Sequence, residues 1–264
     1  MKTLKEFSEM SEVTIVTHNG ICHSDETLAV AVLMLYFNKK GIEEVKVIRT
    51  REITEVPEDS LIIDVFGGEL DHHQMAPVYD GGRELASIGK VWRWGKTEFI
   101  EEFKLDETTW REVDVNLFKW VDITDNTGEM NPFNWVFNCV RNSGWEIALD
   151  YIKNIMENVL ESMAKKAEEI REYNNLPVRE IGGLSFRYSE KFLPAVGEEN
   201  KDVKGLIWHE NGHIKIRTLN GFTLKPGLGK GNGVIFTHKG GWIGEVESLE
   251  DLPKVFPDTA EERV

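Results

Sequence analysis

The sequence has few cysteines, no long apolar run and no excess of basic residues. Its two cysteines, Cys22 and Cys139, form no paired motif, so we do not expect a disulfide framework. No stretch approaches about 20 consecutive apolar residues, and the start of the chain lacks the apolar core of a signal peptide. We therefore expect a soluble protein of the reducing cytoplasm, with no membrane partner.

Positive charge is scarce as well. The 264 residues carry 31 Lys and Arg against 46 Asp and Glu, which gives a formal net charge of −15. A protein that grips long duplex nucleic acid neutralises many phosphates with basic side chains, and this composition argues against that class. It does not exclude a nuclease, because bound divalent ions and a local basic patch can reverse the potential where a phosphate lies.

Short apolar runs alternate with a helical segment in the first part of the chain. The runs at residues 13–16, 45–48 and 61–63 predict strands, and residues 27–39 predict a helix closed by Gly41. This alternation predicts an α/β domain with a mainly parallel sheet. In such sheets ligands bind beyond the carboxyl ends of the strands.

The second part of the chain follows a different pattern. Apolar residues recur with helical period over residues 144–174 and predict a long amphipathic helix. After Pro177 come short strand-like runs, two of which flank Asn211-Gly212, a strong hairpin signal. We predict three parts: a catalytic domain over 1–145, a connecting helix over 146–177 and a smaller α/β or β-rich domain over 178–264.

Histidines and aspartates gather beyond the predicted strand ends. A single histidine in a loop is most often an ordinary surface residue, and an aspartate at a strand end is often a turn-former or helix cap. So many ionisable groups at one sheet edge, however, would repel one another or be poorly solvated unless cations neutralised them. Imidazoles and carboxylates are ligands that Mn, Zn or Fe ions accept. The candidate residues of this metal site are His18, His23, Asp25, Asp64, Asp71, His72, His73, Asp122 and Asp125.

These residues stand in motifs that resemble a known family. The motifs are His18-Asn19-Gly20-Ile21-Cys22-His23-Ser24-Asp25-Glu26, Ile48-Arg49-Thr50-Arg51, Asp64-Val65, Asp71-His72-His73-Gln74, Ala86-Ser87-Ile88-Gly89 and Asp122-Ile123-Thr124-Asp125-Asn126. In order and rough spacing they resemble the MYG1 family (UPF0160) of the DHH phosphoesterase superfamily, over residues 13–128 and more weakly over 234–244. The resemblance implies a DHH-type domain, a DHHA1-like C-terminal domain and a manganese-dependent phosphoesterase, since MYG1 proteins are regarded as 3′-to-5′ RNA exonucleases.

The resemblance also implies roles for single residues. His18, His23 and Asp25 would hold two divalent ions, most simply Mn²⁺, with Asp64 bridging them and His72 completing the ligand set of the second ion. Asp122 and Asp125 both stay candidates for the last ligand. Asp71 would orient a histidine. His73 would contact the scissile phosphate or protonate the leaving oxygen.

Three further residues are predicted to bind substrate. Arg49 and Arg51 follow a strand at the same sheet edge, and guanidinium groups match phosphate oxygens. Ordinary surface salt bridges are the alternative for both. In the C-terminal part, His238 follows a glycine-rich stretch at 227–233 that could approach a phosphate or could be a plain flexible hairpin.

The function that we predict is a two-metal phosphodiesterase that uses an activated water. Its substrate would be short single-stranded nucleic acid, attacked by 3′-to-5′ exonuclease action, or a nucleotide. Two alternatives stay open: a phosphatase or pyrophosphatase that acts on a small molecule at the same site, and a metal- or nucleotide-binding protein without turnover. The sequence does not fix the oligomeric state, and a homo-oligomer stays open.

Overall fold

The computed structural model describes residues 2–73, 76–196 and 201–257, and the chain forms two compact units, residues 1–167 and 168–264. The first unit holds the following elements: α1 (Leu4–Ser8), β1 (Val13–Thr17), α2 (Ser24–Lys39), β2 (Val45–Arg49), the 3₁₀ turn η1 (Ile53–Glu55), β3 (Leu61–Ile62), β4 (Tyr79–Asp80), β5 (Arg83–Glu84), α3 (Ser87–Trp94), α4 (Lys96–Glu102), α5 (Glu107–Val113), the π-helical turn η2 (Asp114–Phe118), α6 (Lys119–Thr127), α7 (Pro132–Arg141) and the first part of α8 (Trp145–Asn175).

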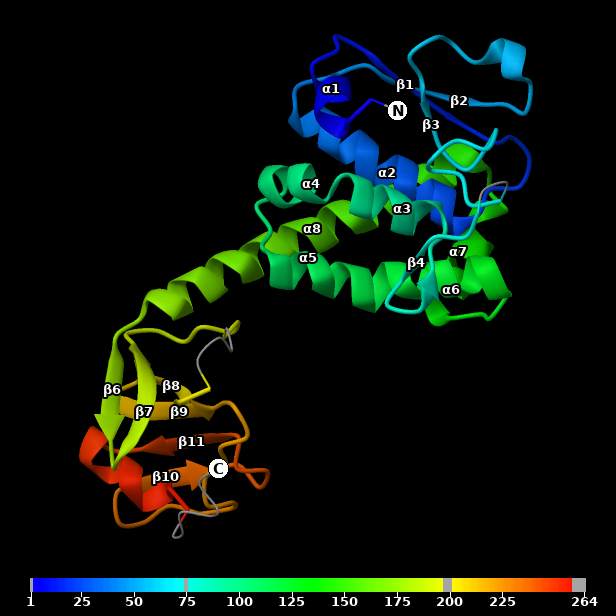
Figure 1. Ribbon diagram of the computed structural model, residues 1–264. Coiled ribbons are helices and arrows are strands. Elements are labelled where there is room, and N and C mark those ends of the chain that lie inside the picture. The colour runs from blue at the N-terminus through cyan, green and yellow to red at the C-terminus, as the bar shows by residue number, and fades with distance from the viewer. Residues whose placement is uncertain (1, 74–75, 197–200, 258–264) are drawn as a thin grey trace. The chain divides into compact units, whose positions relative to one another are not determined.

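The main sheet of the first unit has three strands in the order β2-β1-β3, and both pairings are parallel. Val13 of β1 pairs with Val45 of β2, and Ile15 of β1 pairs with Leu61 of β3. In Figure 1 the three strands, coloured blue to cyan, are drawn above α2. The predicted α/β class with a parallel sheet is confirmed.

Helix α2 is the centre of the first core. Its residues from Ser24 to Leu33 are all buried, and from Leu28 onward this stretch is apolar on every side, as expected of a helix enclosed in a core. Each fully buried Leu or Phe contributes roughly 1.5–3 kcal/mol relative to an exposed one. A cluster of aromatic rings extends this core, with Trp92 stacked on Trp110 at 5.7 Å between ring centres. The first turn of α2, which carries Asp25 and Glu26, therefore rests on a rigid base.

The predicted long helix is confirmed as α8. Ala148, Ile152, Met156 and Leu160 recur along one stripe of this helix and pack into the core of the first unit. The rest of its surface is rich in charged residues. Among the described residues, no helix combines the length and the apolar character that crossing a membrane would require.

The second unit is built on a six-stranded sheet in the order β10-β11-β9-β8-β7-β6. Its strands are β6 (Val178–Ile181), β7 (Leu184–Ser189), β8 (Val203–Glu210), β9 (His213–Thr218), β10 (Val234–Thr237) and β11 (Ile243–Val246), followed by the 3₁₀ helix η3 (Leu249–Val255). Only the β7–β8 pairing is parallel among those described. The core contains Phe186, Phe222 and Phe256. The predicted separate C-terminal sheet region is confirmed.

The predicted hairpin at Asn211-Gly212 is present between β8 and β9. Glu210 pairs with His213, which leaves two loop residues, and both have positive φ (54° at Asn211 and 81° at Gly212). A two-residue loop with positive φ at both positions matches the right-handed twist of the flanking strands.

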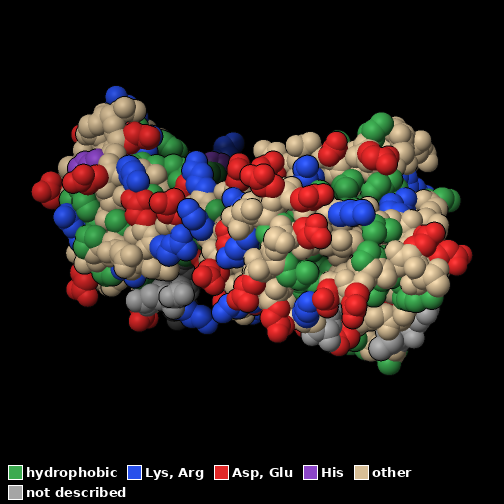
Figure 2. Space-filling model, turned by 90° about the horizontal axis from the view of Figure 1, so that it is seen from above, with side chains coloured by type: hydrophobic (Ala, Val, Ile, Leu, Met, Phe, Trp, Pro, Cys, Tyr) green, Lys and Arg blue, Asp and Glu red, His purple; other side chains and the backbone are tan. Residues whose placement is uncertain are grey.

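Acidic and basic side chains lie intermingled over the face drawn in Figure 2.

Candidate metal centre

The three parallel strands all end at one edge of the sheet, and polar residues follow each of them. The loop after β1 begins with His18, and β2 ends at Arg49. Just beyond the end of β3, the Ile63 N–H donates to the Val16 carbonyl oxygen, and Asp64 follows Ile63. Because the strands are parallel, their carboxyl ends meet. The predicted gathering of His18, Arg49 and Asp64 at this edge is what the structure shows.

Three overlapping groups of side chains could each hold a metal ion. In every group the potential ligand atoms lie within 4.8 Å of one another. The groups share members: Asp64 belongs to the first and second, and His23 to the first and third. They comprise His18, His23, Glu26 and Asp64; Asp64, His72 and His73; and His23, Asp25 and Asp125.

Asp64 lies between two sets of imidazoles. Its Oδ2 atom is 3.3 Å from His18 Nε2, whereas its Oδ1 atom is 3.4 Å from His72 Nε2 and 3.5 Å from His73 Nε2. The Ser87 hydroxyl donates to Oδ1 at 2.8 Å and holds the carboxylate in this orientation. The Asp64 backbone has a φ of 58°, a left-handed conformation that aspartate adopts more often than most residues other than glycine. The two carboxylate oxygens thus face different groups.

Two of the imidazoles have Nδ1 beside a hydrogen-bond acceptor and Nε2 turned toward the carboxylates of the site. His18 Nδ1 lies 3.0 Å from the Asn19 carbonyl oxygen, and His72 Nδ1 lies 3.2 Å from Asn126 Oδ1. Both partners are acceptors, so each Nδ1 carries a hydrogen, and in the neutral imidazole each Nε2 offers its lone pair to a metal ion. The side-chain N–H groups of Asn126 donate to Glu84 and Asp122 carbonyl oxygens, which fixes its Oδ1 toward His72. Metal-ligating histidines are oriented in this way by their second nitrogen.

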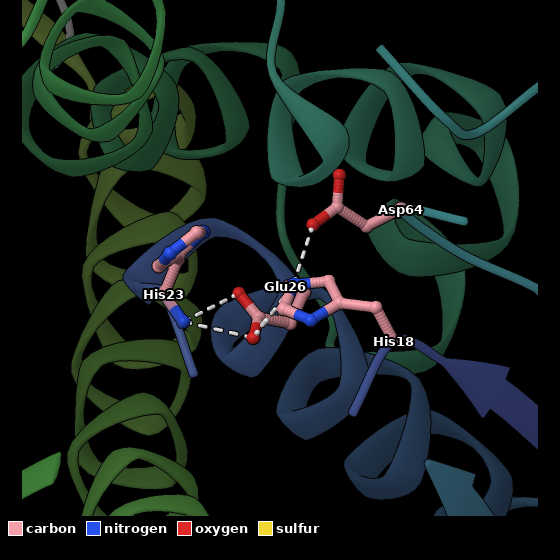
Figure 3. A group of neighbouring side chains, drawn as sticks. All are labelled: His18, His23, Glu26 and Asp64. Carbon is pink, nitrogen blue, oxygen red and sulfur yellow. Dashed lines mark hydrogen bonds and ion pairs between the residues drawn. The ribbon is translucent and has the colours of Figure 1, made fainter. Parts of the chain in front are cut away.

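Glu26 belongs to the first group, although the sequence alone predicted no role for it. It is fully buried, and its Oε1 atom lies 3.3 Å from His18 Nε2. Its carboxylate also accepts the His23 backbone N–H at 2.8 Å to each oxygen, and this bond caps the start of α2. Figure 3 shows His18 between Glu26 and Asp64, with the His23 backbone directed at Glu26. The spacing of His23 and Glu26, three residues apart at a helix start, was the available signal.

The third group joins the start of α2 to α6. Asp125 Oδ2 lies 3.0 Å from His72 Nε2, and Asp25 Oδ2 lies 3.5 Å from the same atom. The Ser87 backbone N–H donates to Asp25 Oδ2 at 3.3 Å. His72 therefore links the second and third groups, and Ser87 contacts a carboxylate of each.

Asp122 and Asp125 lie on the same helix, but only Asp125 joins a ligand group. The Asp122 carboxylate lies 3.0 Å from Arg83 Nε and accepts the Ala86 backbone N–H at 3.0 Å. It is packed against Gly89, where a Cβ atom would lie 2.5 Å from Asp122 Oδ2. Asp122 therefore anchors the start of α3, which carries Ser87.

Asp71 bonds to backbone rather than to an imidazole. Its Oδ2 atom accepts the Gly67 N–H at 2.7 Å, and its Oδ1 atom accepts the His73 N–H at 2.8 Å. The Lys90 ammonium donates to the Asp71 carbonyl oxygen at 2.7 Å and further fixes this segment. Asp71 thus orients His73 through its main chain. The His73 side chain is 48% exposed, so its ring is accessible to a substrate.

The buried acids have strongly perturbed pKa values. Burial raises the pKa of Glu26 to about 8, and burial together with the charges of Asp64 and Asp125 raises the pKa of Asp25 well above its ordinary value. Burial lowers the pKa of His18, but the Asp64 and Glu26 carboxylates outweigh it and the net shift is upward. Such shifts show how unfavourable the clustered negative charges are without a cation.

The donor set fits divalent cations. Several buried side-chain atoms have no hydrogen-bond partner among the described residues, although a buried polar atom in that state costs about 1–3 kcal/mol. A cation coordinated by them would satisfy these atoms and neutralise the carboxylates together. The unsatisfied atoms of the groups are His18 Nε2, His23 Nδ1, Asp25 Oδ1, Asp64 Oδ2 and His72 Nε2.

The predicted substrate-binding residues lie in three different settings. Arg49 belongs to the sheet edge, with its Nη2 atom 3.8 Å from Glu26 Oε1. Arg51 is exposed just beyond the edge. His238 is exposed in the second unit, where its Nδ1 atom accepts the Gly240 N–H and its ring lies 4.8 Å from the ring of Trp242. A substrate role for His238 stays a prediction.

Comparison with known proteins identifies one family. The model named MYG1_exonuc, described as an uncharacterised protein family (UPF0160), matches residues 14–175, which is more than half of the chain and includes every member of the three ligand groups. The family name denotes an exonuclease. No curated protein and no solved structure matches the chain significantly.

Proposed function

The chain belongs to the MYG1 family (UPF0160), and we propose that it is a metal-dependent phosphodiesterase, a 3′-to-5′ exonuclease that acts on short single-stranded RNA or related oligonucleotides. The observation that supports this most is the position of Asp64, whose two oxygens face His18 on one side and His72 with His73 on the other. A carboxylate in that position can bridge two ions. The DHH-type and DHHA1-like assignments of the two domains belong to the same proposal.

Two divalent ions would be held by the three ligand groups. His18, Glu26 and Asp64 would hold one ion, and Asp64, His72, Asp25 and Asp125 would hold the other, with His23 placed between them. Mixed nitrogen and oxygen donors suit Mn²⁺. When bound, the ions supply Lewis-acid activation of a water and neutralise charge on the phosphate.

The remaining residues act on the substrate. His73 is the exposed imidazole of the site, and Asp71 fixes its backbone, so it is placed to donate a proton to the leaving oxygen. Arg49 offers a guanidinium to a phosphate oxygen of the substrate. Ser87 holds Asp25 and Asp64 in place without contacting substrate.

The charge of the molecule favours short substrates. A net charge of −15 repels a long polyanion, and the basic side chains in Figure 2 are interspersed among acidic ones rather than gathered in a broad track. A short oligonucleotide would meet mainly the local field of the bound cations and Arg49.

The test is an assay with each of Mn²⁺, Mg²⁺, Zn²⁺ and Fe²⁺ against short RNA, short DNA, cyclic dinucleotides and pyrophosphate. We expect Mn²⁺-stimulated release of mononucleotides from the 3′ end of 5′-labelled RNA. Asp64→Asn should reduce this activity by about a thousandfold, above the 10–100-fold loss typical of residues that only support ligands. Asp150→Asn, which alters an exposed aspartate on α8, is the matched control.

Two results would contradict the proposal. Pyrophosphate hydrolysis with intact oligonucleotides would assign the site to a small-molecule phosphatase instead. An Asp64→Asn variant that keeps wild-type phosphodiesterase activity would show that the ligand groups are not the reaction centre.

A further inference from the structure

A pocket of 400 Å³ borders the first ligand group, between the loop after β1, the end of β2 and the turn from α7 to α8. Cys22, Arg49, Arg141, Asn142 and Trp145 line it. Cys22 directly precedes His23, and Arg49 approaches Glu26, so the pocket adjoins the proposed metal centre. Its volume lies within the range of about 300–1,000 Å³ that is common for small-molecule sites.

Arg49 is held rigidly but leaves donors unused. Its guanidinium stacks on the Trp145 ring, with Cζ 4.2 Å from the ring centre, and its Nη1 atom donates to the Gly20 carbonyl oxygen at 3.2 Å. Its Nε and Nη2 atoms are buried and have no hydrogen-bond partner among the described residues. Nε and Nη2 form one edge of the guanidinium, an edge that can bind a phosphate or carboxylate in bidentate fashion, and here its Nη2 atom lies 3.8 Å from Glu26 Oε1.

Arg141 brings a second guanidinium to the same pocket. Its Nη1 atom donates weakly to the Cys22 carbonyl oxygen at 3.4 Å. Within the described part of the chain, no acidic side chain forms an ion pair with Arg141, and Glu26 is the single acid that pairs with Arg49, at 3.8 Å. Two guanidinium groups that share a pocket with so little counter-charge favour an anion between them.

We infer that this pocket binds a phosphate group of the substrate, that of the nucleotide next to the scissile bond. Arg49 and Arg141 donate to its oxygens from two walls. The identity of the substrate rests on the proposed function, whereas binding of a phosphate group to the two arginines does not depend on hydrolysis. A phosphate anchored here places the neighbouring phosphodiester at the ligand groups, which converts binding energy into positioning.

The test uses the full chain in EDTA and measures binding of inorganic phosphate and of 5′-AMP by isothermal titration calorimetry, with adenosine as the uncharged comparison. We expect both phosphate compounds to bind and adenosine to bind far more weakly. Arg141→Gln should weaken phosphate and 5′-AMP binding about tenfold, because it removes a charged donor.

Two further variants sharpen the result. Asn142→Asp adds a negative charge to the pocket wall without removing either arginine, and it should weaken phosphate binding by a similar factor. Arg171→Gln alters an exposed arginine farther along α8 and should bind phosphate like the wild type. Melting temperatures identify any variant that is misfolded. Wild-type phosphate affinity in folded Arg141→Gln and Asn142→Asp would overturn the inference.

The failure of this inference and the failure of the proposed function give different results. If the wild type binds phosphate through Arg141 but hydrolyses no phosphodiester with any metal, the proposed function is wrong and the phosphate site stands. If it hydrolyses oligonucleotides while Arg141→Gln changes neither phosphate affinity nor the KM for a dinucleotide, the phosphate site is wrong and the proposed function stands.

Discussion

The two units differ in how their ionisable side chains are buried and paired. At the sheet edge of the first unit, imidazoles and carboxylates are buried together, and five of their atoms have no hydrogen-bond partner among the described residues. In the second unit, His213 Nδ1 lies 2.6 Å from Glu245 Oε1, and the His213 side chain is 41% exposed. The second arrangement is an ordinary surface pair, worth about 0–1 kcal/mol.

The difference identifies the part of the fold in which buried polar groups lower the folding stability. Buried and unsatisfied polar atoms destabilise the fold unless a bound species satisfies them. The described residues of the second unit include no imidazole or carboxylate atom in that state. The sheet edge of the first unit is therefore the part of the molecule whose arrangement calls for a ligand.

The largest expected effect is a difference in kcat/KM between variants of two histidines, one from each unit. His72→Gln should lower Mn²⁺-dependent kcat/KM by about a thousandfold, more than the 10–100-fold loss expected of a supporting residue, because it removes a donor that faces Asp25, Asp64 and Asp125. His213→Gln should leave kcat/KM within about twofold, since a surface pair contributes little. Steady-state kinetics on a short RNA measure both. Equal losses in the two variants would contradict the contrast between the units.

A smaller effect, on Mn²⁺ affinity, is expected to distinguish variants of two buried serines, one from each unit. Ser87 donates to Asp64 from its hydroxyl and to Asp25 from its backbone, whereas Ser189 in the second unit accepts the Lys191 N–H. Ser87→Ala should weaken Mn²⁺ binding by roughly 10–100-fold, as loss of an outer-shell partner does, and Ser189→Ala should not. Calorimetric titration with Mn²⁺ gives both affinities. Because Ser87 is a positioning residue, saturating Mn²⁺ should restore most of the kcat of Ser87→Ala, and no restoration would refute that role.

The sequence predicted that the candidate residues would gather at one edge of the sheet. Apolar runs that end in His18, Arg49 and Asp64 indicate strands, and parallel strands bring their carboxyl ends together. The pairing of β1 with both β2 and β3 follows that expectation. Likewise, Asn211-Gly212 predicted its hairpin because a short loop of this kind needs two residues that tolerate positive φ.

The choices that sequence reasoning left open depend on tertiary neighbours. Asp122 and Asp125 are three residues apart on α6, and helical spacing alone leaves both on a similar face. Arg83 and the Ala86 N–H, which come from β5 and the start of α3, engage Asp122 and leave Asp125 to His72. No local pattern encodes that choice.

Asp71 and Glu26 show a second limit of sequence reasoning. The Asp71 carboxylate accepts backbone N–H groups of its own loop, a role that depends on the path of the chain between Gly67 and His73. Glu26 both caps α2 and faces His18. Residue type predicts a carboxylate at each position but not which neighbour it meets.

The last expected effect concerns acids rather than histidines and depends on pH. Burial raises the pKa of Glu26 to about 8, so in the metal-free protein this group is mostly protonated at pH 7, whereas its unfolded form is ionised. A raised pKa of this kind favours the folded state at low pH, and the contribution is lost as the pH rises from the ordinary value of 4.5 through about 8. Metal binding needs the ionised form, so Mn²⁺ should displace the proton.

Mn²⁺ affinity should therefore rise by about tenfold per pH unit for one displaced proton between pH 6 and 8. Calorimetry at pH 7 in buffers of different ionisation enthalpy counts the protons released. Glu26→Gln should release fewer protons than the wild type, although Asp25, whose pKa is also raised, still contributes. Glu245→Gln in the second unit should release as many as the wild type, because Glu245 lies outside the three ligand groups. The same Mn²⁺ affinity at pH 6 and pH 8 would show that the buried acids of the sheet edge are already ionised without metal, and the contrast between the two units would then rest on their unsatisfied atoms alone.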